Sequence, residues 1–367
     1  MPRLDAIDRK TVQKIERMAE LVLRTTRGGK NPFLEIPIRS LANVKFNERK
    51  RLIELGSQKQ KRYLLNVAMA KKFMQTFLVS EACKELIDSG KTTSIRDLYY
   101  MTKHVLGDTK QNTFEEQDES DPIIEDLEVA IDSLREELHL FASRKGTMVG
   151  PLTIRDAGDT IDLRRMGSGG WGVPSIVEEH VIAFGKQEAK YVLLIEKDAT
   201  WSRFNEDRFW QREKCIIVHG GGQPPRGVRR IVQRLHTELK LPVYVLVDND
   251  PWGLYIYSVV KQGSINLAYE SMRMAVPDAR FVGLSSFDKV KYKLPSNVHV
   301  PMNDQDNSRA KQMLAYPWFQ APKWQKEIQE MVRSGQKYEL EALTRRGISF
   351  ITEEYLPRKL RDRDWLE

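Results

Sequence analysis

Two apolar runs in this chain each end in acidic residues. Glu196 directly follows the run at 191–195, and Asp248 and Asp250 follow the run at 243–247. Five-residue aliphatic runs bounded by charge are typical of buried strands in a parallel sheet. A carboxylate at the carboxyl end of such a strand lies where open α/β sheets bind ligands. Residues two apart in extended backbone point the same way. Three oxygen ligands suit Mg²⁺, so the sequence predicts a magnesium site.

A second candidate for chemistry lies on a helix that we expect to begin at Ser94. Its apolar residues follow helical periodicity and turn Tyr99 toward the core. Arg96, Tyr100 and Lys103 then share the outer face. Neighbouring cations favour a phenolate and would also hold a phosphate, so Tyr100 is a candidate nucleophile. The alternative is an ordinary exposed tyrosine on a basic helix.

A glycine-rich turn follows a third apolar run. Gly221 lies in the sequence HGGGQP at 219–224, whose backbone N–H groups could cradle a phosphate. It is not a Walker loop, because no Gly-Lys-Ser/Thr follows. His219 could approach the acidic site and contact DNA, or it could be a structural histidine that ends a strand.

The composition fits a folded protein with a polyanionic partner. The chain has 367 residues, 41% hydrophobic and 30% charged, with a net charge of +8 and a pI of about 9.2. No apolar run approaches the ~20 residues needed to span a bilayer, and the first residues lack a signal-peptide pattern. Cys83 and Cys215 are expected to be core thiols. We therefore expect a cytosolic or nuclear protein with no membrane contact.

The charge is unevenly distributed. Residues 1–72 carry 18 Lys+Arg and 7 Asp+Glu, whereas residues 108–137 carry 2 Lys+Arg and 12 Asp+Glu. The basic arm could follow a DNA backbone by releasing counterions, or it could be a solvated helical surface. The acidic stretch is expected to be a loop followed by the outer face of a helix.

The pattern of elements predicts two kinds of domain. Short helices at 63–69, 73–87, 94–106 and 122–142, followed by strand-like segments at 147–150 and 152–154, indicate a winged-helix (CAP-like) module. Strands near 191–195, 215–218, 243–247, 280–284 and 297–301, separated by helices at 227–239 and 254–268, indicate a mostly parallel sheet flanked by helices. The fold class is therefore α/β plus α+β. The expected domains are a basic N-terminal helical extension (1–60), the winged-helix domain (61–154), a glycine-rich linker (155–178), and an α/β domain with a helical C-terminal part (179–367).

Several motifs occur in an order that resembles one known family. The sequence RDLYY at 96–100 is similar to the catalytic-tyrosine motif of topoisomerase VI A subunits and the related meiotic double-strand-break transesterase, where the second tyrosine is the nucleophile. Glu196 and DNDPWG at 248–253 resemble the Toprim signature, and MGSGGWG at 166–172 resembles a family loop. The resemblance covers roughly residues 60–360. Asn249 departs from the common glycine, and we expect little effect because its side chain faces away from the carboxylates.

The resemblance implies a mechanism and an assembly. Tyr100 would attack a DNA phosphodiester and form a 5′-phosphotyrosyl link, with Arg96 stabilising the phosphate. Mg²⁺ would be held by Glu196 and Asp248, and by Asp250 directly or through water. Double-stranded DNA is the implied substrate. The implied location is the cytoplasm, nucleoid-associated in an archaeal cell, or the nucleus in a eukaryote. A homodimer of A subunits and an ATPase B subunit, which brings ATP, would form an A2B2 heterotetramer. The basic arm could also contact the B subunit.

Three other functions remain open from the sequence. A break-forming transesterase that rarely reseals DNA would use the same chemistry. A Toprim metal-dependent nuclease would use the carboxylates without Tyr100. A non-enzymatic winged-helix DNA binder is disfavoured by the presence of all three carboxylates.

Overall fold

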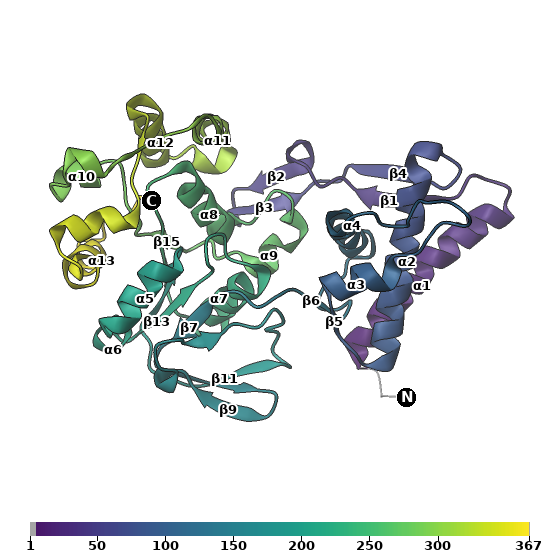
Figure 1. Cartoon of the computed structure of the whole chain (residues 1–367), viewed down its shortest axis with the longest axis horizontal. Helices are drawn as coiled ribbons and strands as arrows, with labels where there is room; N and C mark the ends of the chain where they lie inside the picture. The colour runs from purple at the N-terminus through teal and green to yellow at the C-terminus, as the bar shows by residue number, and fades with distance from the viewer. Residues whose placement is uncertain (1–4, 367) are drawn as a thin grey trace. The chain divides into compact units, whose positions relative to one another are not determined.

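The computed structural model describes residues 5–366, and the chain forms two compact units. The first unit contains residues 1–43 and 55–143, and the second contains residues 44–54 and 144–367. Each unit has its own core, and each is described by itself below (Figure 1).

The first unit is mainly helical. Helix α1 begins after the N-cap Asp5 and is followed by its C-cap Gly28. The extension expected to be helical at 1–60 therefore contains a long helix, and strands follow from Phe33 onward. The β1–β4 ladder is antiparallel, and the short β5–β6 pair is parallel. The elements are α1 (Ala6–Arg27), β1 (Phe33–Pro37), β4 (Lys59–Tyr63), α2 (Val67–Ser89), β5 (Thr93–Ser94), α3 (Ile95–Thr102), α4 (Ser120–Ile131) and β6 (Leu140–Phe141).

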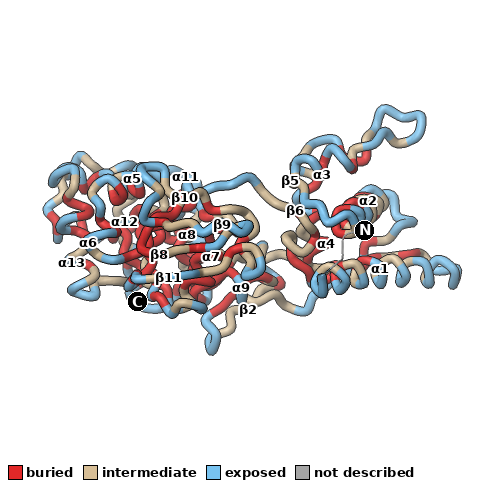
Figure 2. The backbone as a smooth tube through the Cα atoms, turned by 90° about the horizontal axis from the view of Figure 1, so that it is seen from below, coloured by how far each residue is buried: buried red, intermediate tan, exposed pale blue. Residues whose placement is uncertain are grey.

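Two helices of this unit differ from the sequence prediction. The two helices expected at 63–69 and 73–87 are one helix, α2, which starts after the N-cap Asn66. The helix expected to reach residue 142 stops at Ile131, because Asp132 adopts a left-handed conformation (φ 50°) and ends it. Apolar residues beyond this point, such as Leu138, still pack into the core, which is why periodicity overestimated the length. Helix α1 is buried only along one side (Figure 2).

The second unit is built on a six-stranded sheet in the order β10-β7-β13-β12-β14-β15. Strands β13, β12, β14 and β15 are parallel, β7 pairs antiparallel with β13, and β10 pairs antiparallel with β7. The mixed α/β class with a parallel core is therefore confirmed. The strands are β7 (Thr147–Val149), β10 (Trp171–Gly172), β12 (Tyr191–Ile195), β13 (Cys215–His219), β14 (Val243–Leu246) and β15 (Arg280–Phe281).

Side chains alternate between the two faces of this sheet. Leu193, Ile195 and Ile217 pack against α5 (Asp198–Glu206), α6 (Phe209–Glu213) and the C-terminal helices. On the other face, α7 (Arg226–Leu239) packs against β12. Because both faces are covered, the central strands read as continuous apolar runs. All residues of β12 and β13 are buried.

The direction of the chain reverses at β12. The connection through α5 and α6 leads from β12 to β13 on one side, and α7 carries the chain across to β14 on the other side. The connections that leave β12 and β14 therefore diverge at the carboxyl ends of these two strands. Open α/β sheets bind ligands at such an edge, which we call the crevice. Glu196 and Asp248 follow these two strands, as predicted.

Strand β7 differs from the expected organisation. The segment at 147–150 was grouped with the helical module, but Val149 and Met148 pair with Ile217 and Val218 of β13. This pairing joins residues about 70 positions apart, so it cannot be predicted from the local sequence pattern around β7. The expected glycine-rich linker overlaps β8 (Leu152–Asp156), β9 (Asp159–Asp162) and β10; β8 and β9 form a small sheet with β11 (Ile182–Gln187). The exact domain borders stay predictions.

The remaining elements surround the main sheet. Residues 44–54 form a hairpin of β2 (Val44–Asn47) and β3 (Leu52–Leu55), where Arg51 pairs with Asp278. The segment expected as a strand at 297–301 contains β16 (Val300–Pro301), which pairs with β17 (Gln336–Lys337) outside the main sheet. The helices are α8 (Pro251–Gln262), α9 (Ser271–Met274), α10 (Asp288–Lys291), α11 (Asp304–Leu314), α12 (Pro322–Ser334) and α13 (Leu356–Arg361).

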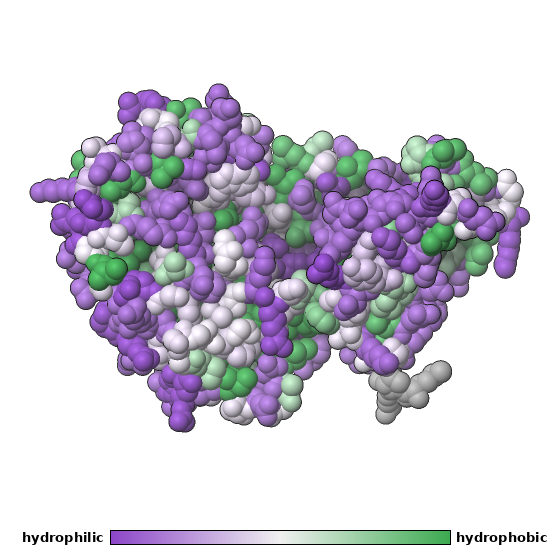
Figure 3. Space-filling view, viewed as in Figure 1, coloured by the Kyte–Doolittle hydropathy of each residue, from purple (hydrophilic) through white to green (hydrophobic). Residues whose placement is uncertain are grey.

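Other sequence expectations concern single residues and the surface. Cys83 and Cys215 are buried free thiols, as expected. Within the part of the chain that the structure describes, no helix is long and apolar enough to cross a membrane. The face shown in Figure 3 is largely hydrophilic, with small scattered apolar groups.

Candidate active site

The carboxylates predicted to bind metal gather at the crevice between β12 and β14. The Glu196 N–H donates to Leu246 O at 3.0 Å, which continues the parallel ladder past Ile195. The Asp248 N–H donates to Glu196 Oε2 at 3.1 Å. The side chain of Glu196 therefore reaches over the start of the Asp-x-Asp segment, and the two sequence-distant acids meet as predicted.

Asp248 is the most enclosed of the three acids, with 3% of its surface exposed. Its Oδ1 accepts the Leu340 N–H at 2.8 Å, and its Oδ2 lies 2.8 Å from the ammonium of Lys197. Burial raises the pKa of Asp248 to about 6, although these two contacts act in the opposite direction. Both carboxylate oxygens are therefore engaged within the protein.

Asp250, which is predicted to bind the metal, also caps a helix. It is the N-cap of α8, and its Oδ1 accepts the Gly253 N–H at 2.6 Å. Pro251 occupies the first helical position, where its missing N–H costs nothing. Burial raises the pKa of Asp250. One oxygen of this carboxylate is thus committed to the helix, which leaves the other for a ligand.

The charge balance of the crevice fits a bound cation. Burial raises the pKa of Glu196 to about 8, and the negative charges of Asp248 and Asp250 act in the same direction. The positive charge of Lys197 acts on all three carboxylates, and that of Lys337 acts on Asp250 as well. Hard oxygen donors of this kind suit Mg²⁺. Among residues 5–366, however, no set of three or more His, Cys, Asp or Glu side chains is already arranged as a metal site. The donor chemistry fits the metal, and the Lys197 ammonium lies 2.8 Å from Asp248 Oδ2.

Residues 338–341, which we call the strap, lie along the Asp-x-Asp segment and were not anticipated from the sequence. The Asn249 N–H donates to Tyr338 O at 2.8 Å, and the Tyr338 N–H returns a bond to Asn249 O at 3.0 Å. The Leu340 N–H holds Asp248, as described above. Glu339 and Glu341 lie 3.4 and 3.0 Å from the Lys197 ammonium. These contacts join positions from 89 to 144 residues apart, so only the folded chain reveals them.

The glycine-rich turn lies beside Glu196. The Gly222 N–H donates to Glu196 O at 2.9 Å. Gly221 is exposed with φ +67°, a conformation that favours glycine, and a Cβ at Gly220 would come within 2.5 Å of Pro224. The glycines are thus required by the turn, and a role of Gly221 in DNA binding stays a prediction.

His219 has the geometry of a structural histidine. It ends β13 with 6% of its surface exposed, and its Nε2 lies 2.6 Å from Thr147 Oγ1 and 3.2 Å from Asp198 Oδ1. Its ring packs against Trp201 at 5.2 Å, and burial lowers its pKa. A direct DNA contact would need an exposed ring, so the geometry favours the structural alternative.

Asn249 faces away from the carboxylates, as expected, but it occupies a buried polar network. Its Nδ2 donates to Glu327 Oε1 at 2.8 Å, and its Oδ1 accepts from Ser286 Oγ at 3.3 Å. The Ser286 N–H also donates to Glu327 Oε1 at 2.6 Å. Asn249 and Glu327 are fully buried, and burial raises the pKa of Glu327. Contrary to our expectation of little effect, this side chain therefore matters for stability.

Replacing Asn249 with alanine should destabilise the second unit by about 1–3 kcal/mol, because buried Glu327 loses a donor that nothing replaces. Urea unfolding measures the change. Asn307→Ala on α11 is the matched control, since Asn307 bonds only to a local carbonyl of its own helix start, and it should change stability by less than about 0.5 kcal/mol. Equal stabilities for both variants would contradict the role given to the network.

Tyr100 lies on α3 in the first unit. Ser94 caps this helix by accepting the Asp97 N–H, and the Asp97 carboxylate accepts the Ser94 hydroxyl in return. Tyr99 is buried and its hydroxyl donates to Glu115 O at 2.9 Å, whereas Tyr100 is 63% exposed. The sequence prediction that the first tyrosine packs and the second projects is confirmed. Arg96 is exposed on the same helix.

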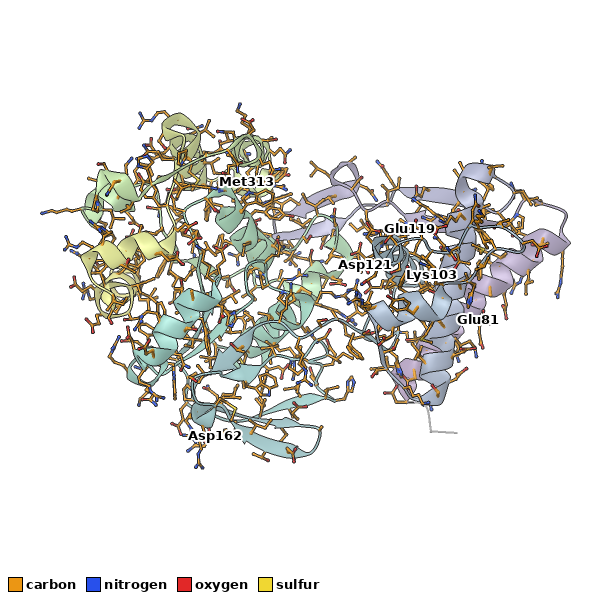
Figure 4. All side chains as sticks on the ribbon, in the orientation of Figure 1. Glu81, Lys103, Glu119, Asp121, Asp162 and Met313 are labelled. Atoms are coloured by element: carbon orange, nitrogen blue, oxygen red, sulfur yellow. The ribbon has the colours of Figure 1, made fainter. Side chains whose placement is uncertain are left out.

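Lys103, which is labelled in Figure 4, does not sit beside Tyr100 as the helical spacing suggested. Helix α3 ends at Thr102, and Lys103 is already extended (φ −84°, ψ 110°). Its ammonium donates to the Tyr99 hydroxyl at 2.6 Å and to Glu115 O at 3.0 Å. Of the two cations expected near Tyr100, only Arg96 keeps the helical relationship to Tyr100.

Family comparisons agree with this combination of elements. Residues 191–360 match the family model for the Toprim domain of topoisomerase 6 A subunits and Spo11, and residues 71–140 match the model described as "Type IIB DNA topoisomerase". Residues 145–186 match "All-beta domain in DNA topoisomerase VI alpha subunit". The sheet with the carboxylate crevice is therefore a Toprim domain, and α3 with Tyr100 lies within the type IIB topoisomerase match.

Similarity to curated proteins extends along nearly the whole chain. The A subunit of type 2 DNA topoisomerase 6 from Pyrococcus horikoshii is 43% identical over 96% of this chain and 94% of that protein. The protein of the same name from Hyperthermus butylicus is 40% identical over 97% of this chain and 94% of its own length. The A3 subunit of DNA topoisomerase 6 from Oryza sativa is 36% identical over 96% of this chain and 78% of its own length. The chain belongs to the family of type IIB DNA topoisomerase A subunits.

Proposed function

We propose that this chain is the catalytic, DNA-cleaving subunit of a type IIB DNA topoisomerase. The observation that carries the proposal is the pairing, in one member of this family, of an exposed tyrosine on a capped helix with a carboxylate crevice at the sheet's switch point. A nucleophile on one unit and a charge-stabilising site on the other are the two components that phosphoryl transfer to a protein side chain needs.

The reaction exchanges one phosphoester for another. The Tyr100 oxygen attacks a DNA phosphorus, the P–O3′ bond breaks, and a 5′-phosphotyrosyl bond forms. The phenol loses its proton and the released 3′-oxygen gains one, so that no water is consumed. The reverse reaction reseals the strand, because the energy of the phosphoester is kept in the phosphotyrosyl bond. Tyr100 is suited to this role because its hydroxyl is exposed while Tyr99 anchors the helix.

Other residues of the first unit would position the DNA. Arg96, one turn before Tyr100, would place a guanidinium beside the phosphate as negative charge develops. Helices α2, α3 and α4 would act as a winged-helix domain that presents α3 to the duplex. Lys103, which is held by Tyr99, would contribute positive field and support the packing of Tyr99.

Glu196 and Asp248 would hold Mg²⁺, with Asp250 as a further direct or water-mediated ligand. When bound, the metal would supply positive charge for the DNA phosphates and the leaving oxygen. The protein's own contribution is rigidity: the β12–β14 ladder, the strap and the α8 cap fix the three carboxylates before DNA arrives.

The assembly follows from the chemistry of a double-strand break. Each copy of the chain supplies one tyrosine, so cutting both strands requires two copies, and we propose a homodimer of A subunits. ATP-driven strand passage would come from an ATPase B subunit in an A2B2 complex. A protein with this substrate works where chromosomal DNA is kept, in the cytoplasm or the nucleus.

A DNA topology assay tests this function. The full chain is mixed with its cognate B subunit, ATP, Mg²⁺ and supercoiled or catenated plasmid. We expect relaxation and decatenation that require both proteins and ATP. Linear DNA that accumulates with protein attached, without relaxation, would instead identify a break-forming transesterase. Linear or nicked DNA free of protein would identify a Toprim nuclease and overturn the proposal.

A further inference from the structure

Lys197 is the cation that sits within the carboxylate crevice. Its ammonium lies 2.8 Å from Asp248 Oδ2, 3.0 Å from Glu341 Oε2 and 3.4 Å from Glu339 Oε2. It therefore bridges the most buried of the proposed metal ligands and two carboxylates of the strap. Lys197 has no role in the mechanism described above, and the strap enters it only by fixing Asp248 through the Leu340 N–H.

The two sides of this bridge differ in their surroundings. The Asp248 side chain is 4% exposed, whereas Glu339 and Glu341 are 53% and 45% exposed. Asp248 also keeps its bond from the Leu340 N–H, which fixes the carboxylate through Oδ1. If the ammonium left Oδ2, Asp248 would stay in place, and the ammonium would still have two carboxylates within reach.

We propose that Lys197 is an internal counter-cation that occupies the metal's position on Asp248 and transfers to Glu339 and Glu341 when a divalent cation binds. This inference rests on the proposed function of Glu196 and Asp248 as metal ligands. Before the metal arrives, the ammonium compensates the buried charge of Asp248, which would otherwise be costly to keep ionised. When the metal binds, two cations compete for one oxygen, and the strap gives the displaced ammonium a partner.

The inference predicts opposite effects from two changes. Lys197→Met keeps an unbranched side chain that is one atom shorter and removes the competing charge, so the dissociation constant for the metal should fall at least about fivefold. The double variant Glu339→Gln, Glu341→Gln removes the alternative partners of the ammonium, so Lys197 should stay on Asp248. The dissociation constant should then rise by about threefold or more.

Combining the changes distinguishes two explanations for the effect of the glutamates. Either they accept the displaced ammonium, or their negative charges attract the metal directly. In the Lys197→Met background, the two glutamine substitutions should have at most a small effect, because no ammonium remains to be accepted. If the glutamates act only through their own charge, the glutamine substitutions would weaken binding by the same factor in both backgrounds. Non-additivity in this cycle is thus the decisive quantity.

The experiment titrates the full-length chain, without DNA, with Mn²⁺ and follows the electron paramagnetic resonance signal of the free ion. Lys186→Met is the control for net charge, since Lys186 is 73% exposed and pairs with Glu188 on the small sheet. It should leave the dissociation constant within about a factor of two. Thermal melts check that each variant folds. If the Lys197→Met variant does not fold, Lys197→Gln is used in its place.

The outcomes distinguish this inference from the proposed function. Tighter Mn²⁺ binding by Lys197→Met, with a non-additive cycle, supports the inference. Unchanged or weaker binding by Lys197→Met, or an additive cycle, overturns it and leaves the metal site standing. If the Glu196→Gln variant binds Mn²⁺ as tightly as the wild-type chain does, the assignment of the metal site itself fails.

Discussion

Tyr100→Phe should abolish DNA cleavage, lowering the rate of adduct formation by at least about three orders of magnitude. The substitution removes only the hydroxyl oxygen, which is the proposed nucleophile. Because Tyr100 is 63% exposed, the fold and the affinity for DNA should be unchanged. Cleavage is measured with end-labelled duplex DNA in the presence of Mg²⁺ and the B subunit, and binding is measured by fluorescence anisotropy.

The neighbouring tyrosine supplies the matched control. Tyr99→Phe removes a hydroxyl that donates to Glu115 O and accepts from Lys103, so it should cost about 1 kcal/mol of stability. Cleavage should persist, because the buried Tyr99 hydroxyl faces the protein. Cleavage that survives Tyr100→Phe but disappears in Tyr99→Phe would exchange the roles of the two residues and reject our assignment.

Glu196→Gln should produce the second large effect, a loss of metal-dependent cleavage by about two to three orders of magnitude. The amide keeps the shape of the side chain and removes the charge that a divalent cation needs. Addition of Mg²⁺ should raise the melting temperature of the wild type and have little effect on the variant. Glu206→Gln on α5, a change at a carboxylate with 70% of its side chain exposed, should behave as the wild type.

The same variant should melt at a higher temperature than the wild type when chelator is present. An acid whose pKa rises on folding binds its proton more tightly in the folded state. Glu196 therefore lowers the stability of the folded state. This loss grows as the pH rises from 4.5, the ordinary pKa of a glutamate, to about 8, the pKa of Glu196 in the folded state, and it is constant at higher pH. Glutamine has no such dependence, so the advantage of the variant should increase across this range. If the wild type is more stable than the variant at pH 8 without metal, then burial and the neighbouring carboxylates do not destabilise ionised Glu196, contrary to our interpretation.

The parts of the fold that could be predicted are those governed by local patterns. Strands β12, β13 and β14 were located within a residue or two, because strands covered on both faces must be apolar throughout. The orientations of Tyr99 and Tyr100 followed from helical periodicity, and the meeting of Glu196 with Asp248 followed from the geometry of parallel strands.

The parts that could not be predicted depend on contacts between distant segments. The bond from the Leu340 N–H to Asp248 crosses 92 positions, and the pairing of Lys197 with Asp248 crosses 51. Lys197 follows Glu196 directly, yet nothing in its neighbourhood indicates which carboxylate it contacts. Lys103 is misplaced for a local reason: α3 ends at Thr102, four residues before the end at 106 that the apolar pattern predicts, and the side chain of Lys103 is redirected to Tyr99.

The most direct test of the central proposal is to identify the bond between protein and DNA. The wild-type chain, its B subunit, Mg²⁺ and duplex DNA are mixed, denatured and digested, and the peptides are analysed by mass spectrometry. We predict a nucleotide joined through its 5′-phosphate to the peptide that contains Tyr100, with free 3′-hydroxyl ends on the cut DNA. An adduct on another residue, or cut DNA without any attached peptide, would contradict the account.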